Sequence, residues 1–245
     1  MIPCALIIPA RLSSQRFPRK LLHPINGKPL ILWTADNLSK SDIGWPVFFA
    51  VEDEELKDVL EKAGHRAILT NIHPSGTDRI AEANLSVKAE IVINIQADEP
   101  LTGVEHVKHL YSLMANGADM GTLAHRFENQ EDFKNPNRVK VVTGIEGQAL
   151  YFSRAPIPHP RETDLPENSE NTLLHLGMYA YTAKFLKAFT QLPQGTLEKI
   201  EKLEQLRALE NGYHIQVGIT RTPGFGVDTN EDAILLEQKL KQMTG

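Results

Sequence analysis

The chain has 245 residues, of which 41% are hydrophobic and 23% are charged, and this balance is typical of a globular protein of one or two domains. Its formal net charge of −5 argues against a general nucleic-acid-binding surface, because such surfaces are usually basic. A single cysteine excludes an intrachain disulfide and a cysteine-based metal site, and the lack of a signal peptide or an apolar run of membrane length predicts a cytoplasmic enzyme.

The first half of the sequence alternates short apolar runs with amphipathic stretches. The apolar runs predict strands, and apolar residues spaced three or four apart predict helices. In chain order we expect a strand at 5–8, a helix at 29–38, a strand at 46–51, a helix at 54–63, a strand at 67–69, a helix at 77–85 and a strand at 91–95. This alternation predicts an α/β fold with a mostly parallel sheet and helices on both faces, so the ligand site should lie at the carboxyl ends of the strands.

The second half has a different pattern of short strands and loops. In chain order we expect strands at 139–142, 149–152 and 178–182, a long loop at 154–171, a helix at 197–212 and a last helix at 231–243. The loop is rich in Pro, Glu and Asn and has no apolar period. Long loops in compact domains tend to be functional or mobile.

The loop after the first strand carries the most informative motif. Residues 9–20 read Pro-Ala-Arg-Leu-Ser-Ser-Gln-Arg-Phe-Pro-Arg-Lys and include the cations Arg11, Arg16, Arg19 and Lys20. Because cations this close repel one another, they need solvent or an anion. A polyphosphate fits best, since guanidinium groups bind phosphate oxygens in pairs. The alternative is a solvated basic turn.

Two aspartates are candidate ligands of a metal ion. Asp98 follows the strand at 91–95, and Asp228 lies in a glycine-bearing turn before the last helix. Mg²⁺ at nucleotide sites usually takes one or two carboxylates together with substrate phosphates. In the alternative interpretation Asp98 caps a following helix and the turn with Asp228 is only the start of the last helix. The local sequence does not bring the two aspartates together.

Residues 73–79, His-Pro-Ser-Gly-Thr-Asp-Arg, form a turn that leads into a helix. Free backbone N–H groups and small side chains at such a turn suit a base edge or an anion. A plain capping turn explains the local sequence equally well.

Polar residues in the second half indicate an acidic, hydroxylated second substrate. Two arginines, Arg154 and Arg161, lie in the long loop. A strand and a helix add the side chains of His175, Tyr179, Tyr181, Glu201, Glu204 and Gln205. The strand members alternate and so share one face, and the helix members share a face at three- and four-residue spacing. The alternative is a solvated helix face, which is favoured for Glu201.

Together these motifs resemble the 3-deoxy-manno-octulosonate cytidylyltransferase family, also called CMP-Kdo synthetases. The matching blocks, in chain order, are P-A-R-L-S-S-Q-R-F-P-R-K, H-P-S-G-T-D-R-I-A-E, N-P-N-R-V-K-V-V, A-L-Y-F-S-R-A-P-I-P, H-L-G-M-Y-A-Y, L-E-Q-L-R-A-L and G-V-D-T-N-E-D. The first block occurs across related nucleotidyltransferases. The blocks S-R-A-P-I-P, H-L-G-M-Y and L-E-Q-L-R are far more specific to the Kdo branch.

The resemblance implies a fold, an activity and partners. The fold would be a Rossmann-like, three-layer α/β nucleotidyltransferase with a mostly parallel central sheet and a smaller β-containing subregion. The chain would form a single domain, with CTP bound mainly by 1–125 and the sugar acid and a second subunit mainly by 126–245. The enzyme would be a Mg²⁺-dependent homodimer that makes CMP-Kdo and pyrophosphate from CTP and Kdo for lipopolysaccharide synthesis, without nucleic acid or membrane insertion.

The resemblance also implies residue roles. The CTP phosphates would be held by Arg11, Ser14, Arg16 and Lys20. The cytidine side would be lined by Ala10, Ser75, Gly76 and Arg79. The ion Mg²⁺ would bind to Asp98 and Asp228, which with Arg16 and Lys20 form the catalytic set. The sugar acid would be held by Gln96, Arg154, Arg161, His175, Tyr179, Glu204 and Gln205. Arg19 matches no family position for a charge and is interpreted as a solvated surface residue.

One position departs from the family pattern. The family has Q-G-D-E-P where this chain has Ala97 in Gln-Ala-Asp-Glu-Pro, and the added methyl group disfavours a positive φ. Either the backbone differs slightly there or the sugar is modified. The alternative substrates are therefore an 8-amino analogue of Kdo or another ulosonic acid such as sialic acid. A separate alternative, from another class of protein, is a nucleotide-binding homologue without turnover.

Overall fold

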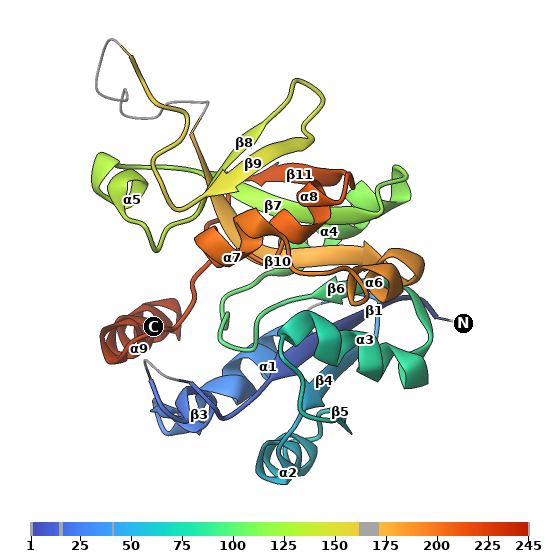
Figure 1. The fold of residues 1–245 in the computed structure, drawn as a ribbon. Helices are drawn as coiled ribbons and strands as arrows, with labels where there is room; N and C mark the ends of the chain where they lie inside the picture. The colour runs from blue at the N-terminus through green and yellow to red at the C-terminus, as the bar shows by residue number, and fades with distance from the viewer. Residues whose placement is uncertain (1, 15–16, 41, 162–171, 245) are drawn as a thin grey trace. The chain divides into compact units, whose positions relative to one another are not determined.

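The computed structural model describes residues 2–14, 17–40, 42–161 and 172–244 (Figure 1). These residues cluster into two compact units. Unit 1 comprises Met1–Val107 and Gly224–Gly245, and unit 2 comprises Lys108–Pro223. The sequence predicted a CTP-binding half up to residue 125 and a sugar-binding half after it. In the structure, the C-terminal residues 224–245 instead cluster with the N-terminal residues in unit 1.

Unit 1 contains every element expected in the first half, with ends that differ by a few residues. Its elements in chain order are β1 (Ile2–Ala10), the 3₁₀ helix η1 (Lys20–Leu22), β2 (Pro24–Ile25), β3 (Lys28–Pro29), α1 (Leu30–Lys40), β4 (Val47–Val51), α2 (Glu54–Lys62), β5 (Ala67–Leu69), α3 (Gly76–Val87), β6 (Ala89–Asn94) and α9 (Asn230–Thr244). A further helix, α4 (Val104–Ala115), begins in unit 1 and continues into unit 2. In the described part of the chain, no helix is both long and apolar enough to cross a membrane.

The parallel strands of unit 1 create a ligand-binding position. Their order is β6-β1-β4-β5, and all three pairings are parallel. The chain moves from β1 to β4 to β5 in one direction and then returns to place β6 on the other side of β1. The connections after β1 and β6 therefore diverge, and such a switch point is where open α/β sheets bind ligands. The middle of β1, from Cys4 to Ile8, is fully buried, which explains its continuous apolar run.

Unit 2 is a mixed sheet with short helices. Its elements after α4 are β7 (Met120–Arg126), α5 (Gln130–Lys134), β8 (Lys140–Thr143), β9 (Ala149–Ser153), β10 (Leu173–Thr182), α6 (Ala183–Phe189), α7 (Thr196–Glu201), α8 (Leu206–Glu210) and β11 (Ile215–Thr220). β7 pairs in parallel with β11 and antiparallel with β10, and β8 pairs antiparallel with β10 and β9. β10 begins at Leu173 rather than at residue 178, because a register shift between Leu176 and Tyr179 interrupts the alternation that marks a strand.

The single helix expected over 197–212 is wrong, because the structure breaks it into α7 and α8. Lys202 adopts a left-handed backbone at the break, with a φ of 54°. The buried carboxylate of Glu198 accepts two hydrogen bonds from Arg207, at 2.8 and 2.6 Å. Residues nine apart point to opposite sides of a continuous helix, which turns roughly 100° per residue. The pair can therefore form only if the helix breaks.

Candidate active site

A cavity of about 740 Å³ lies in unit 1 where β1 and β6 end. This volume is in the usual range for a small-molecule site. Its wall includes many of the residues predicted from the sequence, namely Arg11, Ser14, Lys20, Gly76, Arg79, Gln96, Asp98 and Asp228. The cavity therefore lies at the switch point of the sheet and brings the basic loop together with both candidate metal ligands.

Lys20 lies between the two aspartates. Its amino group donates to the carboxylate of Asp98, to Asp228 Oδ1 at 3.0 Å and to the carbonyl oxygen of Val227 at 3.1 Å. Burial alone would lower the pKa of Lys20, but the two carboxylates outweigh burial and raise it. Lys20 is therefore a fixed cation at neutral pH. The structure thus brings together two aspartates that the local sequence could not connect, whereas Arg16 lies outside the described residues.

The donor set of Asp98 and Asp228 fits Mg²⁺. Both carboxylates converge on one ammonium group, so they already create a place for positive charge. Among the described residues, no group of three His, Cys, Asp or Glu side chains could hold a metal ion by itself. At nucleotide sites, Mg²⁺ usually binds one or two carboxylates, and substrate phosphates and water fill its other coordination positions. The two aspartates match this pattern.

Glu99 is a half-buried residue with a buried carboxylate oxygen, Oε2, and the sequence interpretation missed it. Burial, together with the nearby charges of Asp98 and Asp228, raises its pKa to about 7. A hydrogen bond from the backbone N–H of Phe225 opposes this rise and ties Glu99 to the turn that carries Asp228. The only sequence signal was its place next to Asp98 at the end of β6.

We expect Glu99 to make the free energy of unfolding fall as the pH rises from 4.5 to 7. In this window the folded protein keeps the proton on Glu99 and the unfolded chain loses it, so rising pH favours the unfolded chain. The Glu99→Gln variant should lack this fall, which amounts to about 3 kcal/mol. Urea unfolding in metal-free buffer across this pH range measures the difference. The exposed Glu61→Gln serves as control, and equal pH slopes for wild type and Glu99→Gln would contradict the assignment.

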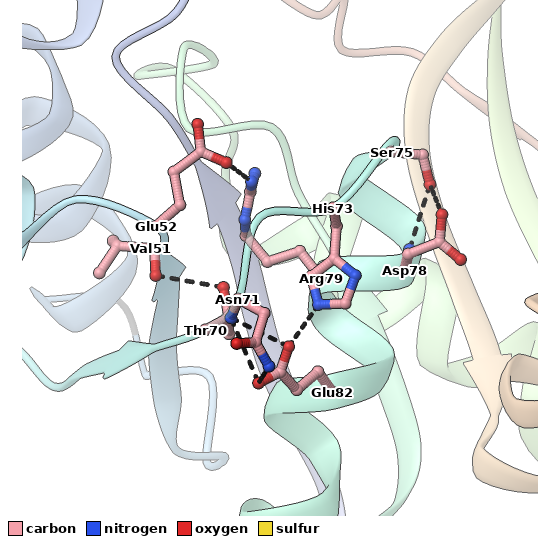
Figure 2. Close-up of polar contacts among 9 residues, drawn as sticks. All are labelled: Val51, Glu52, Thr70, Asn71, His73, Ser75, Asp78, Arg79 and Glu82. Carbon is pink, nitrogen blue, oxygen red and sulfur yellow. Dashed lines mark hydrogen bonds and ion pairs between the residues drawn. The ribbon is translucent and has the colours of Figure 1, made fainter.

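Arg79 lies in the cavity wall with almost no exposure to solvent. Its side chain is 2% exposed and pairs with Glu52, which follows directly after β4 (Figure 2). Burial lowers the pKa of Arg79, Glu52 opposes this, and the cation of Arg11 lowers it again. Its Nε atom is buried without a hydrogen-bond partner among the described residues. An unpaired donor in the cavity wall is suited to an incoming acceptor.

The loop between β5 and α3 is fixed by Glu82, as Figure 2 shows. The carboxylate of Glu82 contacts the ring of His73 and accepts from the backbone and side-chain nitrogens of Asn71. Ser75 caps α3 by accepting from the N–H of Asp78 at 3.1 Å, and its hydroxyl donates to the Asp78 carboxylate. The capping-turn interpretation is therefore correct, and the same turn places Gly76 in the cavity wall.

Two positions near the ends of the strands show how closely the cavity wall is packed. A side chain at Gly76 would meet Pro9 at 3.1 Å, so glycine lets α3 approach β1. Ala97 is buried, accepts a hydrogen bond from the Thr34 hydroxyl at 2.8 Å and is not among the described residues with a positive φ. The alanine therefore fits this backbone, and the departure from the family glycine causes no local strain here.

The remaining residues of the basic loop have different environments. Arg19 is 57% exposed and forms an ion pair with Glu55 at 2.5 Å, which confirms its interpretation as a surface residue. Arg11 is exposed and lines the cavity. The start of the loop is anchored by Asp53, whose carboxylate accepts from the N–H of Leu12 at 3.2 Å. Ala10, the last residue of β1, is buried.

In unit 2, the polar aromatic residues of β10 share one face, as predicted. The rings of His175 and Tyr179 are 5.4 Å apart, and those of Tyr179 and Tyr181 are 5.9 Å apart. Burial lowers the pKa of His175 to about 3, so its imidazole is neutral. His175 Nε2 lies 3.0 Å from the Thr122 hydroxyl. Burial also raises the pKa of Tyr179, so its hydroxyl stays protonated.

For Glu201, near the start of the break between α7 and α8, the sequence favoured a place on a solvated helix face. That interpretation is wrong, because the Glu201 carboxylate accepts from the Ser153 hydroxyl at 2.6 Å and from the N–H of Arg154 at 2.9 Å. Gln205 is 4% exposed, and its Nε2 has no hydrogen-bond partner within the described ranges. Glu204 is half-buried beside Arg207, whereas Arg161 is exposed.

Known proteins resemble this chain over nearly its whole length. Residues 5–216 match the family described as Cytidylyltransferase. The chain belongs to the cytidylyltransferase family. The 3-deoxy-manno-octulosonate cytidylyltransferase of Thermodesulfovibrio yellowstonii is 47% identical over 96% of both chains. An 8-amino-3,8-dideoxy-manno-octulosonate cytidylyltransferase of Shewanella sp. is 43% identical over 96% of this chain and 97% of its own.

Solved structures agree with this family membership. A structure of CMP:2-keto-3-deoxy-manno-octonic acid synthetase complexed with CTP matches this cytidylyltransferase with a TM-score of 0.90 and 35% identity, over 98% of this chain and 99% of that one. The 4-diphosphocytidyl-2C-methyl-D-erythritol synthase of Anaerococcus prevotii, with a TM-score of 0.65 and 12% identity over 98% of this chain and 99% of that one, shares the fold alone. The expected α/β nucleotidyltransferase fold is thereby confirmed.

Proposed function

We propose that this protein transfers the cytidylyl group of CTP to 3-deoxy-manno-octulosonate, forming CMP-Kdo and pyrophosphate. The observation that carries the proposal is the convergence of Lys20, Asp98 and Asp228 in the cavity where β1 and β6 end. The similarity to a synthetase complexed with CTP and to relatives named for this reaction supports it.

The nucleotide would bind in the cavity of unit 1. The triphosphate would meet the cations of the basic loop and the hydroxyl of Ser14, because paired N–H groups and ammonium groups bind phosphate oxygens strongly. The cytidine would lie toward Ala10, Ser75, Gly76 and Arg79. The unpaired Nε of Arg79 supplies a donor there, and Glu52 fixes the direction of its guanidinium group.

Asp98 and Asp228 would hold Mg²⁺, which when bound neutralises phosphate charge and polarises the phosphorus–oxygen bonds. The anomeric hydroxyl of the sugar acid attacks the α-phosphorus of CTP. A new oxygen–phosphorus bond forms, the hydroxyl loses its proton to solvent, the bond to the β-phosphate oxygen breaks, and pyrophosphate leaves. Lys20 and Arg16 would stabilise the negative charge that grows on the leaving group. We assign no general base to this step.

The sugar acid would be recognised by residues of unit 2. The amide nitrogen of Gln205, which has no partner among the described residues, offers a donor to a hydroxyl or carboxylate oxygen. The neutral His175 and the protonated Tyr179 suit hydroxyl groups, because each can donate or accept a hydrogen bond without carrying charge. Arg154 and Arg161 provide positive charge for the acid group. As the family resemblance implies, the enzyme would work as a homodimer in lipopolysaccharide synthesis.

The release of pyrophosphate over a panel of nucleotides and sugar acids tests this function. With Mg²⁺ present, we expect the highest kcat/KM for CTP with Kdo, and no release when a chelator removes the metal ion. Higher kcat/KM with 8-amino-Kdo or sialic acid would reassign the sugar, and the relatives named for the 8-amino sugar make it the first competitor to test. A protein that binds CTP and releases no pyrophosphate with any acid would be a binding homologue.

A further inference from the structure

Lys140 is a fully buried lysine in β8, within the motif N-P-N-R-V-K, and it is not among the residues proposed above to bind a substrate. Its amino group donates to the carbonyl oxygens of Asn135 at 2.9 Å, Arg138 at 2.8 Å and Arg154 at 2.7 Å. A lysine ammonium group has three N–H donors, so all of them are used. Burial lowers the pKa of Lys140, the neighbouring Arg154 lowers it further, and Glu201 opposes both.

A buried cation is costly unless its hydrogen bonds are all satisfied, so this arrangement must hold its three carbonyl groups in a fixed geometry. Two of these groups belong to the loop between α5 and β8, and the third belongs to Arg154 just after β9. Three carbonyl oxygens directed at one point also need a donor, because buried carbonyl groups without partners destabilise the fold. Lys140 therefore joins two segments that are separate in the sequence.

The contacts of Arg154 extend this network to α7. Its Nε donates to the carbonyl oxygen of Glu201 at 2.7 Å, and its Nη1 donates to that of Pro136 at 3.1 Å. Its backbone N–H donates to the Glu201 carboxylate at 2.9 Å. Glu201 is the last residue of α7, and the break that follows it leads to Gln205, whose Nε2 has no hydrogen-bond partner in the described part of the chain. An unbroken series of hydrogen bonds thus runs from Lys140 through Arg154 to the end of α7.

We propose that Lys140 is a positioning residue for the sugar-acid site. It fixes Arg154 and, through Arg154 and Glu201, the break between α7 and α8 that carries Glu204 and Gln205. Lys140 touches no substrate, because it is fully buried and its donors are all used. This inference rests on the proposed function, since it takes Arg154, Glu204 and Gln205 as ligands of the sugar acid.

The Lys140→Met variant tests the inference, because methionine is unbranched like lysine, is only one heavy atom shorter, and removes all three donors. We expect KM for the sugar acid to rise about tenfold while KM for CTP stays within about twofold, because the residues proposed for CTP belong to unit 1. If Lys140 only stabilised the fold, its loss would not raise KM for the sugar acid more than KM for CTP. The matched control is Phe133→Leu, because this buried ring lies 6.0 Å from the Lys140 amino group and the substitution keeps every hydrogen bond of that group. The control should lower thermal stability and leave both KM values unchanged.

Two further variants make every outcome decisive. If Lys140→Met does not fold, Glu201→Gln is tested in its place. This substitution keeps the size of the side chain and weakens its hydrogen bonds with the Ser153 hydroxyl and the Arg154 N–H. It should raise KM for the sugar acid alone. An unchanged KM in the folded variant, or an equal rise for both substrates, would overturn the positioning role.

Gln205→Ala tests the underlying sugar site separately. If it leaves KM for the sugar acid unchanged, the proposed site fails; if it raises KM and Lys140→Met does not, only the role of Lys140 fails.

Discussion

Replacing Lys20 by alanine is expected to lower kcat about a hundredfold or more while the protein stays folded, because one preorganised donor to a developing charge is worth this much. Lys20 is the described side chain that contacts both Asp98 and Asp228, and it faces the cavity proposed for the triphosphate. Its loss removes the cation proposed to stabilise the leaving pyrophosphate and leaves two carboxylates facing each other. Steady-state kinetics at saturating substrates, with circular dichroism to confirm folding, measures the effect.

The neighbouring Arg19 provides the control for this variant. It is also cationic, but it is exposed and pairs with Glu55 on the surface, so Arg19→Ala should change kcat little. A near-normal kcat for Lys20→Ala, or an equal loss for both variants, would show that the Lys20 ammonium group has no special role.

Replacing Asp98 by asparagine should have a comparable effect and should also change the metal requirement. The substitution keeps the shape of the side chain and removes one of the two negative charges proposed to hold Mg²⁺, which prefers carboxylate oxygens. We expect kcat to fall about a hundredfold. We also expect the Mg²⁺ concentration for half-maximal activity to rise. A titration of activity with Mg²⁺ measures both quantities in one experiment.

Asp58→Asn is the matched control for Asp98→Asn. Asp58 lies in α2, is exposed and pairs only with Lys62 among the described residues, so its loss should leave kcat and the Mg²⁺ requirement unchanged. An Asp98→Asn variant with normal kcat and the same Mg²⁺ requirement would remove Asp98 from the metal site.

The sequence predicted unit 1 well because its strands are buried on both faces. Such strands read as continuous apolar runs, as in β1 and β6, and the helices between them keep a clear period. The position of the site followed from the same pattern, because residues just past the strand ends must meet at one edge of a parallel sheet. Asp228, however, does not directly follow a strand of this sheet; a hydrogen bond from the Val227 N–H to the Asp98 carbonyl oxygen, at 3.0 Å, holds the two aspartates near the same lysine.

Unit 2 was harder to predict because contacts distant in the sequence decide its local structure. The pair of Glu198 and Arg207 breaks a helix that the leucine spacing predicts as continuous, and the register shift in β10 obscures its first residues. The supporting residues of the sites were missed for a similar reason. Glu52 and Lys140 look like ordinary charged residues in the sequence, and their burial is set by partners up to 27 residues away.

In the proposed reaction, the sugar acid attacks the α-phosphorus of CTP. The most direct test is phosphorus-31 NMR of the complete reaction with CTP, Kdo and Mg²⁺. The proposed reaction predicts that the three CTP resonances give way to a CMP-sugar phosphodiester and pyrophosphate in equal amounts. The appearance of CDP with inorganic phosphate, or of pyrophosphate with free CMP and no CMP-sugar, would contradict it.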